Sequence, residues 1–269
     1  MRLDSRRMLR SVRAARYVLP FRQGGSVPAL VEADDLGFYV VKLRGASQGP
    51  KVLVAELLAG EIARAAGLRV PELVFVELDR ELAASELDPE IFAPLEASAG
   101  LNLGLDFLPG SVTFDPVAGP LPDADTASRI VLFDAFVTNV DRTPRNTNLL
   151  CWHNQLWLID HGAALYFHHG WRPTDRLEGS RDPFVEVAQH VLLPQAAALG
   201  DAAARLAAVV TNELIDHLVA QIPAIWLESD HAFDDVADHR ASYVAWLRDR
   251  VLALPLLLKE AERARALLV

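Results

Sequence analysis

The chain has 269 residues, of which 51% are hydrophobic and 23% are charged, and its formal net charge is −10. This composition predicts a globular protein with a large core, excludes wholesale disorder and argues against general nucleic-acid binding. A single cysteine, Cys151, excludes an intrachain disulfide and a thiolate-rich metal site, and it favours a reducing, cytoplasmic setting. The apolar runs are too short to be transmembrane segments.

The start of the chain is rich in arginine and lacks the apolar centre of a signal peptide. We expect a helical or loose basic arm here. An organellar transit peptide is the alternative, against which Asp4 counts. The arginines concerned are Arg2, Arg6, Arg7, Arg10, Arg13 and Arg16.

Three strands are predicted next, over residues 17–21, 27–33 and 38–43, because apolar and β-branched residues alternate there between turns. The turn after the first strand contains Gly24, Gly25 and Ser26. An ordinary hairpin turn has this composition. Ahead of a strand that carries a lysine it is also a candidate phosphate-covering loop, since glycine lets backbone amides approach an anion.

Lys42 stands in the otherwise apolar third strand, where a lysine is unusual unless it is paired or at an edge. The following residues 51–66 have the apolar spacing of a helix that ends at Gly67. A carboxylate on this helix is expected to hold Lys42 so that its ammonium group faces nucleotide phosphates. Glu56 is preferred to Glu61 because its neighbours are apolar, and a solvated helix glutamate is the alternative for both.

A linker is predicted over residues 109–122, which contain several Pro and Gly residues. The elements predicted before it are a strand over 72–78, a helix over 88–97 and a strand over 101–108. This pattern places a boundary near residue 108. In a two-lobed kinase the lobes join at this point, and Phe107 and Leu108 are therefore the candidates for holding the adenine edge.

The character of the chain then changes. A helix is predicted over residues 126–137, with Asp123 or Asp125 as its N-cap. Residues 148–152 and 155–159 are predicted to form two antiparallel strands joined by a two-residue turn. This hairpin is expected to return the residue after its second strand to the loop that precedes its first.

Three oxygen-bearing side chains occupy those two places: Asp141 and Asn146 in the loop, and Asp160 after the hairpin. An Asp, an Asn five residues later and a second Asp after a hairpin is how protein kinases arrange a catalytic base and two metal ligands. The pattern predicts Asp141 as the base for an acceptor hydroxyl, and Asn146 and Asp160 as ligands of Mg²⁺. Taken singly, each of the three could instead be an ordinary turn residue. Asp141 could also form a surface ion pair with Arg142.

The remaining sequence gives no second site. His168, His169 and Asp175 suggest zinc at first sight, but no HxxxH or HExxH pattern accompanies them, and surface or loop histidines are favoured. Residues 162–180 are predicted to be irregular. Helices are predicted over 186–193, 196–222 and 233–268, with breaks at Pro194, Pro223 and Pro255.

At these motifs the sequence resembles the HipA-like kinases, specifically the compact HipA-related kinase domains, which are more remotely similar to phosphatidylinositol kinases. The matching segments are 41–43, Glu56 with 62–63, 67–71, 139–142 with Asn146, and 158–162. The resemblance implies that Lys42 binds the ATP phosphates and that Glu56 is the partner that holds Lys42. It implies that Asp141 is the catalytic base and that Asn146 and Asp160 bind magnesium. Asn139 would brace the loop.

The sequence also departs from that family. The Gly24–Ser26 turn is short and matches loosely, and nothing after residue 185 matches a motif. The chain is much shorter than a full HipA toxin, so a DNA-binding antitoxin partner is not implied. His161 replaces the Phe of ordinary protein kinases, so regulation by a moving Phe is not implied either.

The expectation is therefore an α+β, bilobal, protein-kinase-like fold, with a β-rich N-lobe over 1–108 and a mainly helical C-lobe over 109–269. The expected activity is transfer of the γ-phosphoryl group of ATP, with Mg²⁺, to a hydroxyl acceptor, and protein Ser/Thr is the acceptor favoured. The alternatives are a nucleotide-binding pseudokinase that regulates a partner, and a small-molecule or lipid kinase of the same fold. The acceptor and the oligomeric state are not specified by the sequence.

Overall fold

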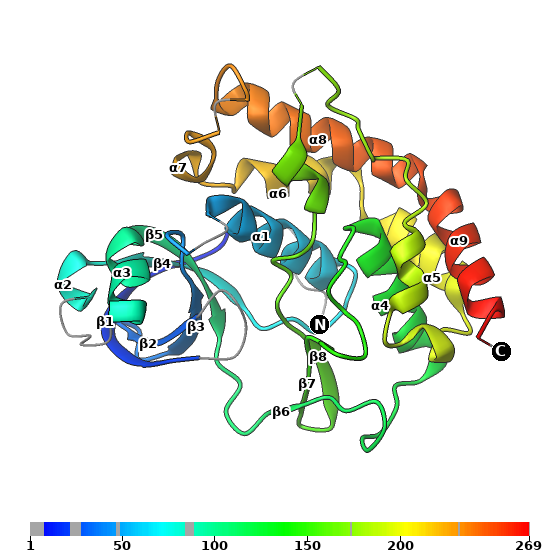
Figure 1. Cartoon of the computed structure of the whole chain (residues 1–269), viewed down its shortest axis with the longest axis horizontal. Coiled ribbons are helices and arrows are strands. Elements are labelled where there is room, and N and C mark those ends of the chain that lie inside the picture. The colour runs from blue at the N-terminus through cyan, green and yellow to red at the C-terminus, as the bar shows by residue number, and fades with distance from the viewer. Residues whose placement is uncertain are drawn as a thin grey trace.

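The computed structural model describes residues 8–21, 28–46, 49–83, 89–172, 174–230 and 232–268. The candidate phosphate loop of Gly24, Gly25 and Ser26 lies outside these residues. The fold mixes a small, sheet-rich N-terminal part with a helical C-terminal part, as the sequence predicted (Figure 1). No helix in the described ranges is both long enough and apolar enough to cross a membrane.

The N-terminal strands close into a barrel with the order β1-β2-β3-β5-β4. The strands are β1 (Ser11–Pro20), β2 (Ala29–Ala33), β3 (Phe38–Lys42), β4 (Leu73–Leu78) and β5 (Gly100–Asp106). Neighbours are antiparallel except β1 and β4, which run parallel and close the barrel. Alternate residues of the strands point inward and fill the barrel with small and branched apolar side chains, including Val12, Val31, Val41 and Val76.

The predicted basic arm is wrong from residue 11 onward, because β1 already begins there. Val12 and Ala14 point inward, whereas Arg13 and Arg16 are exposed, Arg16 after a register shift between Ala14 and Arg16. Those arginines lie against carboxylates of neighbouring strands and turns, for example Arg16 with Glu32 at 2.7 Å and Arg13 with Asp79 at 3.0 Å. The positive charges therefore cover the outside of a strand.

Helix α1 (Pro50–Ala65) lies between the barrel and the C-terminal helices (Figure 1). Proline is its first residue, and Gly67 follows it with φ +73°, a left-handed conformation that suits glycine. The helix is buried almost all round, and it contacts β4 and β5 on one side and α6 and α7 on the other. The apolar core of α1 and the C-terminal helices therefore extends to one face of β4 and β5, through residues such as Leu73 and Leu105, whereas the barrel interior forms a second apolar cluster.

Between β4 and β5 lie the short α2 (Arg80–Ala83) and α3 (Pro89–Ala97). The predicted linker contributes a strand, β6 (Val112–Thr113), which pairs with the predicted hairpin of β7 (Leu149–Trp152) and β8 (Gln155–Leu158). The hairpin turn consists of His153 and Asn154, both with positive φ, as in the primed turns that suit strand twist.

Helix α4 (Ala124–Phe136) precedes the hairpin, and its N-cap is Asp123, whose carboxylate accepts from the Thr126 N–H at 2.7 Å. The later helices are α5 (Leu199–Val209), α6 (Asn212–Ala220), α7 (Ala224–Leu227), α8 (Val236–Leu252) and α9 (Leu254–Ala266). The helix predicted over 186–193 is wrong: short 3₁₀ helices, Val185–Gln189 and Leu193–Gln195, stand there instead.

Candidate active site

The structure brings Lys42, Glu56 and Asp160 together from three separate elements. Lys42 ends β3 and is 5% exposed. Its Nζ lies 2.6 Å from Asp160 Oδ1 and 3.9 Å from Glu56 Oε2. Burial disfavours the charge on Lys42, but the two carboxylates outweigh burial and raise its pKa. A charged ammonium group is therefore held in the interior between two acids.

Glu56 lies in the middle of α1 and is fully buried. Its Oε1 is 3.4 Å from Nδ1 of His161. Burial raises the pKa of Glu56, but Lys42 and His161 lower it more strongly, to about 2, so this carboxylate is ionised. The preference for Glu56 over Glu61 agrees with this geometry, because Glu61 instead pairs with Arg64 on the outer face of α1 at 3.2 Å.

Asp160 follows β8 in a left-handed conformation with φ +53°. The strand before it is fixed by two backbone hydrogen bonds, from Leu158 N–H to the Arg69 carbonyl and from Ile159 N–H to the Asn148 carbonyl. After it, Gly162 lies so close to α1 that a Cβ atom would come within 2.8 Å of Val52 Cγ1. Glycine is thus required for the Asp160 loop to lie against the helix that carries Glu56.

Asp141 lies in the loop between α4 and the hairpin. Its Oδ2 accepts from Asn146 Nδ2 at 2.7 Å and from Asn148 Nδ2 at 3.2 Å, and its N–H donates to Asn139 Oδ1 at 3.2 Å. Within the described ranges no hydrogen bond joins Asn146 to Asp160. Asn148 lies across the hairpin from Ile159, the residue before Asp160, and from sequence it was predicted only as the start of a strand.

A fully buried carboxylate, that of Asp134 on α4, holds this loop by hydrogen bonds. It accepts hydrogen bonds from Asn139 Nδ2 at 2.8 Å, Arg142 Nε at 2.6 Å and His190 Nε2 at 2.9 Å. Burial raises the pKa of Asp134, but the opposing effects of Arg142 and His190 are larger and lower the pKa to about 2. Asn139 and Arg142 flank Asp141 in sequence, so Asp134 fixes the loop on both sides of the proposed base.

This network corrects one interpretation and extends another. Arg142 is 1% exposed and pairs with Asp134, so the alternative of a surface ion pair between Asp141 and Arg142 is wrong. The brace that the resemblance implied for Asn139 is real, but it is anchored on Asp134, which the sequence analysis did not select. A lone Asp inside the apolar run 133–137 was the available signal, whereas nothing near His190 pointed to this role.

The donors available for a metal ion are few. In the described part of the chain no three His, Cys, Asp or Glu side chains are arranged to hold one. The Asp160 carboxylate is 42% exposed and offers a hard oxygen, and Asn146 is exposed and offers a neutral one. One or two protein oxygens suit Mg²⁺, which keeps most of its waters, so these residues fit that ion.

The zinc alternative is not supported. His168 is fully buried, and its Nδ1 lies 3.0 Å from the Tyr243 hydroxyl. Burial lowers the pKa of this histidine well below its ordinary value, which means that it is neutral. The sequence predicts surface or loop histidines here: His169 is exposed, whereas His168 is buried in the short 3₁₀ helix Tyr166–Gly170.

The segment that follows β5 links the barrel to the hairpin. The Phe107 N–H donates to the Phe38 carbonyl at 2.9 Å, and the Pro109 carbonyl accepts from Trp152 Nε1 at 2.9 Å. Leu108 is buried, and its carbonyl accepts from the Ser111 N–H at 3.2 Å. The role of Phe107 and Leu108 at an adenine edge remains a prediction, and some backbone groups here already have partners.

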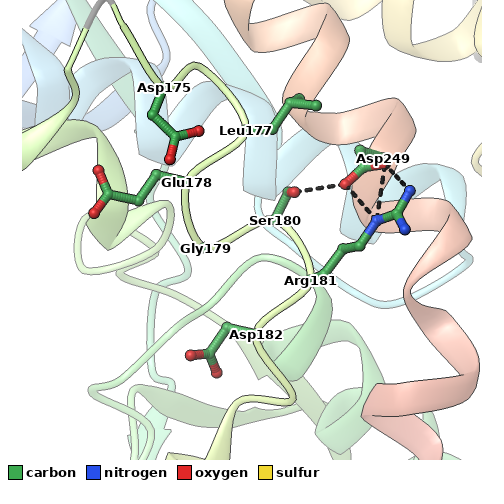
Figure 2. Close-up of a pocket in the computed structure, with 8 residues that line it drawn as sticks. All are labelled: Asp175, Leu177, Glu178, Gly179, Ser180, Arg181, Asp182 and Asp249. Carbon is green, nitrogen blue, oxygen red and sulfur yellow. Dashed lines mark hydrogen bonds and ion pairs between the residues drawn. The ribbon is translucent and has the colours of Figure 1, made fainter.

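A separate pocket of about 450 Å³ lies between the 175–182 loop and α8 (Figure 2). It shares no residue with the Lys42–Asp160 cluster. Its carboxylates are mostly engaged within the protein: Asp249 accepts from Ser180 at 2.6 Å and from Arg181 at 2.7 Å, as the dashed lines show, and Glu178 pairs with Arg172. The candidate active site is therefore the cluster around Lys42.

Comparisons with known proteins identify the family and the fold. The family model of the HipA-like kinases matches residues 16–250. The crystal structure of the Helicobacter pylori proinflammatory kinase CtkA has a TM-score of 0.60 and 13% sequence identity, and the alignment covers 92% of this chain and 96% of that one. No curated protein matches the chain.

Two structures of the Golgi casein kinase are more remote. Their TM-scores are 0.49 and 0.46 at 13% and 12% identity, with 97% and 98% of this chain and 76% of each of those chains covered; the second has Mn/ADP bound. The family match, which spans most of the chain, confirms the resemblance inferred from the motifs. The chain therefore belongs to the HipA-like kinases, a family of phosphotransferases.

Proposed function

We propose that this protein is an ATP- and Mg²⁺-dependent, two-lobed kinase that transfers the γ-phosphoryl group to a hydroxyl, with protein Ser/Thr as the acceptor. One observation carries the proposal: the Lys42 ammonium from the barrel lies 2.6 Å from the Asp160 carboxylate that follows the hairpin. Phosphoryl transfer needs a cation on the phosphates beside a metal-binding oxygen, because catalysis depends on positioning and charge stabilisation.

The described residues divide the work. Lys42 would bind the phosphates, and Asp160 and Asn146 would hold Mg²⁺, which when bound neutralises charge on the phosphates. The described hydrogen bonds to the Asp141 carboxylate all reach Oδ2. Oδ1 is thus left to accept a hydrogen bond from the acceptor hydroxyl and to take up its proton, a contribution of roughly 10²–10⁴-fold.

The surface beside this loop supports a polypeptide acceptor. An open groove of about 570 Å³ lies along Thr143, Pro144 and Arg145, which begin two residues after Asp141, with residues 188–191 on its other side; Asp141 itself does not line it. An extended segment of protein can lie in such a groove while it presents a Ser or Thr to Asp141. A small-molecule acceptor would be better served by an enclosed pocket.

Labelled ATP, Mg²⁺ and a Ser/Thr peptide library provide the test. We expect label transfer by the wild type and none by Asp141→Ala or Asp160→Ala. Thermal stabilisation by Mg·ADP should persist in Asp141→Ala and disappear in Asp160→Ala, because, of these two residues, only Asp160 is assigned to the metal. Equal transfer by all three proteins would refute the proposal. Stabilisation of the wild type without transfer to any acceptor would favour a nucleotide-binding regulator.

A further inference from the structure

Lys42 faces two carboxylates, and its contacts with them are unequal. Its ammonium group lies at hydrogen-bond distance from Asp160 Oδ1, 2.6 Å, but at 3.9 Å from Glu56 Oε2 it falls short of a hydrogen bond. Oε2 of Glu56 is buried and has no hydrogen-bond partner among the described residues. A buried, ionised oxygen without a partner is costly, so this atom needs an explanation.

The proposed function gives Asp160 a second task. A carboxylate that binds Mg²⁺ is close to a doubly charged ion, and the Lys42 ammonium group would be repelled if it stayed on the same oxygen. The nearest anionic atom for it is Glu56 Oε2. A movement of about 1 Å closes the 3.9 Å gap to ordinary hydrogen-bond length.

Glu56 can accept Lys42 only if Oε2 keeps facing it, and His161 provides that constraint. The His161 Nδ1 atom lies 3.4 Å from Oε1, the other oxygen of the same carboxylate, and both side chains are fully buried. Because an ionised carboxylate only accepts, Nδ1 carries the proton. The ring is held by an edge contact with Phe133, with centroids 5.8 Å apart.

We propose, resting on the function proposed above, that His161 is a positioning residue: it ties up Oε1 of Glu56 so that Oε2 receives Lys42 when Mg·nucleotide takes Asp160. His161 directly follows Asp160 in the chain, and Gly162 brings the same loop against α1. The loop that binds the metal thus also orients the carboxylate that takes over the lysine. A Phe at position 161 has no atom that could do this.

Two variants separate this role from simple packing. His161→Leu removes the donor and keeps an apolar side chain of similar bulk, whereas His161→Asn keeps an N–H near the place of Nδ1. His169→Leu is the matched control, because His169 is exposed in the same segment. Urea unfolding of each variant establishes that it is folded, and calorimetric titration with Mg·ADP and with ADP alone gives the affinities.

For His161→Leu we expect Mg·ADP affinity to fall about tenfold or more, the effect of losing one hydrogen bond to a charged group, with little change for ADP alone. The KM for Mg·ATP should rise more than kcat falls. His161→Asn should recover most of the loss, and His169→Leu should equal the wild type. A crystal structure with Mg·ADP should place Lys42 Nζ within 3.5 Å of Glu56 Oε2.

The proposed transfer of Lys42 from Asp160 to Glu56, oriented by His161, is called the exchange. It is refuted if folded His161→Leu binds Mg·ADP like the wild type, or if His161→Asn is as impaired as His161→Leu. It is also refuted if Lys42 remains on Asp160 in the Mg·ADP complex. In these cases the proposed function survives, because wild-type binding and transfer are intact. If the wild type itself does not bind Mg·ADP, the proposed function fails and the exchange fails with it.

Discussion

Replacing Asp134 by Asn tests whether one buried carboxylate holds the loop that carries Asp141, the proposed base. The side chain accepts three hydrogen bonds, from Asn139, Arg142 and His190, and it is fully buried. Asn has nearly the same shape but no charge, and its NH₂ group cannot accept. Arg142 would therefore remain buried without its counter-charge.

The magnitude follows from two independent arguments. The pKa of Asp134 is about 2 against an ordinary value of 3.8, a gap that corresponds to roughly 2 kcal/mol. Since the pKa is lowered on folding, this stability is fully present above pH 3.8 and is lost as the pH falls toward 2. Removing one partner of a buried ion pair typically costs about 3–5 kcal/mol. At pH 7 we expect the free energy of unfolding to fall by roughly 2–5 kcal/mol.

Urea unfolding at pH 7 measures this loss, and kcat measured where the variant is still folded should fall about 10²-fold, since a misplacement of about 1 Å can have that effect. Asp125→Asn is the control on the same helix: Asp125 is 41% exposed and pairs with Arg205, so the change should cost about 1 kcal/mol or less. Equal unfolding free energies and equal kcat for wild type and Asp134→Asn would refute the reasoning.

Two other predictions concern packing and acid. Gly162→Ala should lower stability by about 1–3 kcal/mol and impair activity because its Cβ would lie 2.8 Å from Val52 Cγ1, whereas Gly170→Ala, with nothing within 4 Å, should change the unfolding free energy by less than about 0.5 kcal/mol; equal effects of the two would contradict this. Burial lowers the pKa of His239 from 6.5 to about 4, so the neutral form is favoured in the folded state and stability is lost as the pH falls from 6.5 toward 4. His239→Phe, which keeps the ring stacked on Phe233, should flatten this pH dependence in urea titrations, and an unchanged slope would count against it.

The features predicted from sequence were those with a local pattern. Lys42 stands out in an apolar strand, Glu56 in an apolar helix, and Asp160 at the end of a hairpin whose turn and alternation lie within a few residues. Their meeting could be predicted because a known catalytic arrangement connects the three patterns. The individual roles of these residues stay predictions until the variants are measured.

The features that were missed depend on contacts between distant segments. The parallel pairing of β1 with β4 joins residues 11–13 to residues 75–77, and no local pattern specifies it. For the same reason an arginine-rich strand resembled a loose arm, because its carboxylate partners come from other strands and turns. The Asp134–His190 hydrogen bond joins residues 56 positions apart, and His190 lies in a 3₁₀ region where helical periodicity gave the wrong prediction.

The position of α1 has a consequence for how the molecule melts. Its apolar residues belong to the same core as β4, β5 and the C-terminal helices. The barrel cannot lose its order without exposing α1, and exposing α1 removes the support of the helices on its far side. Heat should therefore produce one calorimetric peak whose van't Hoff and calorimetric enthalpies agree, so that the N-terminal barrel and the loop that carries Asp141 denature as one cooperative unit.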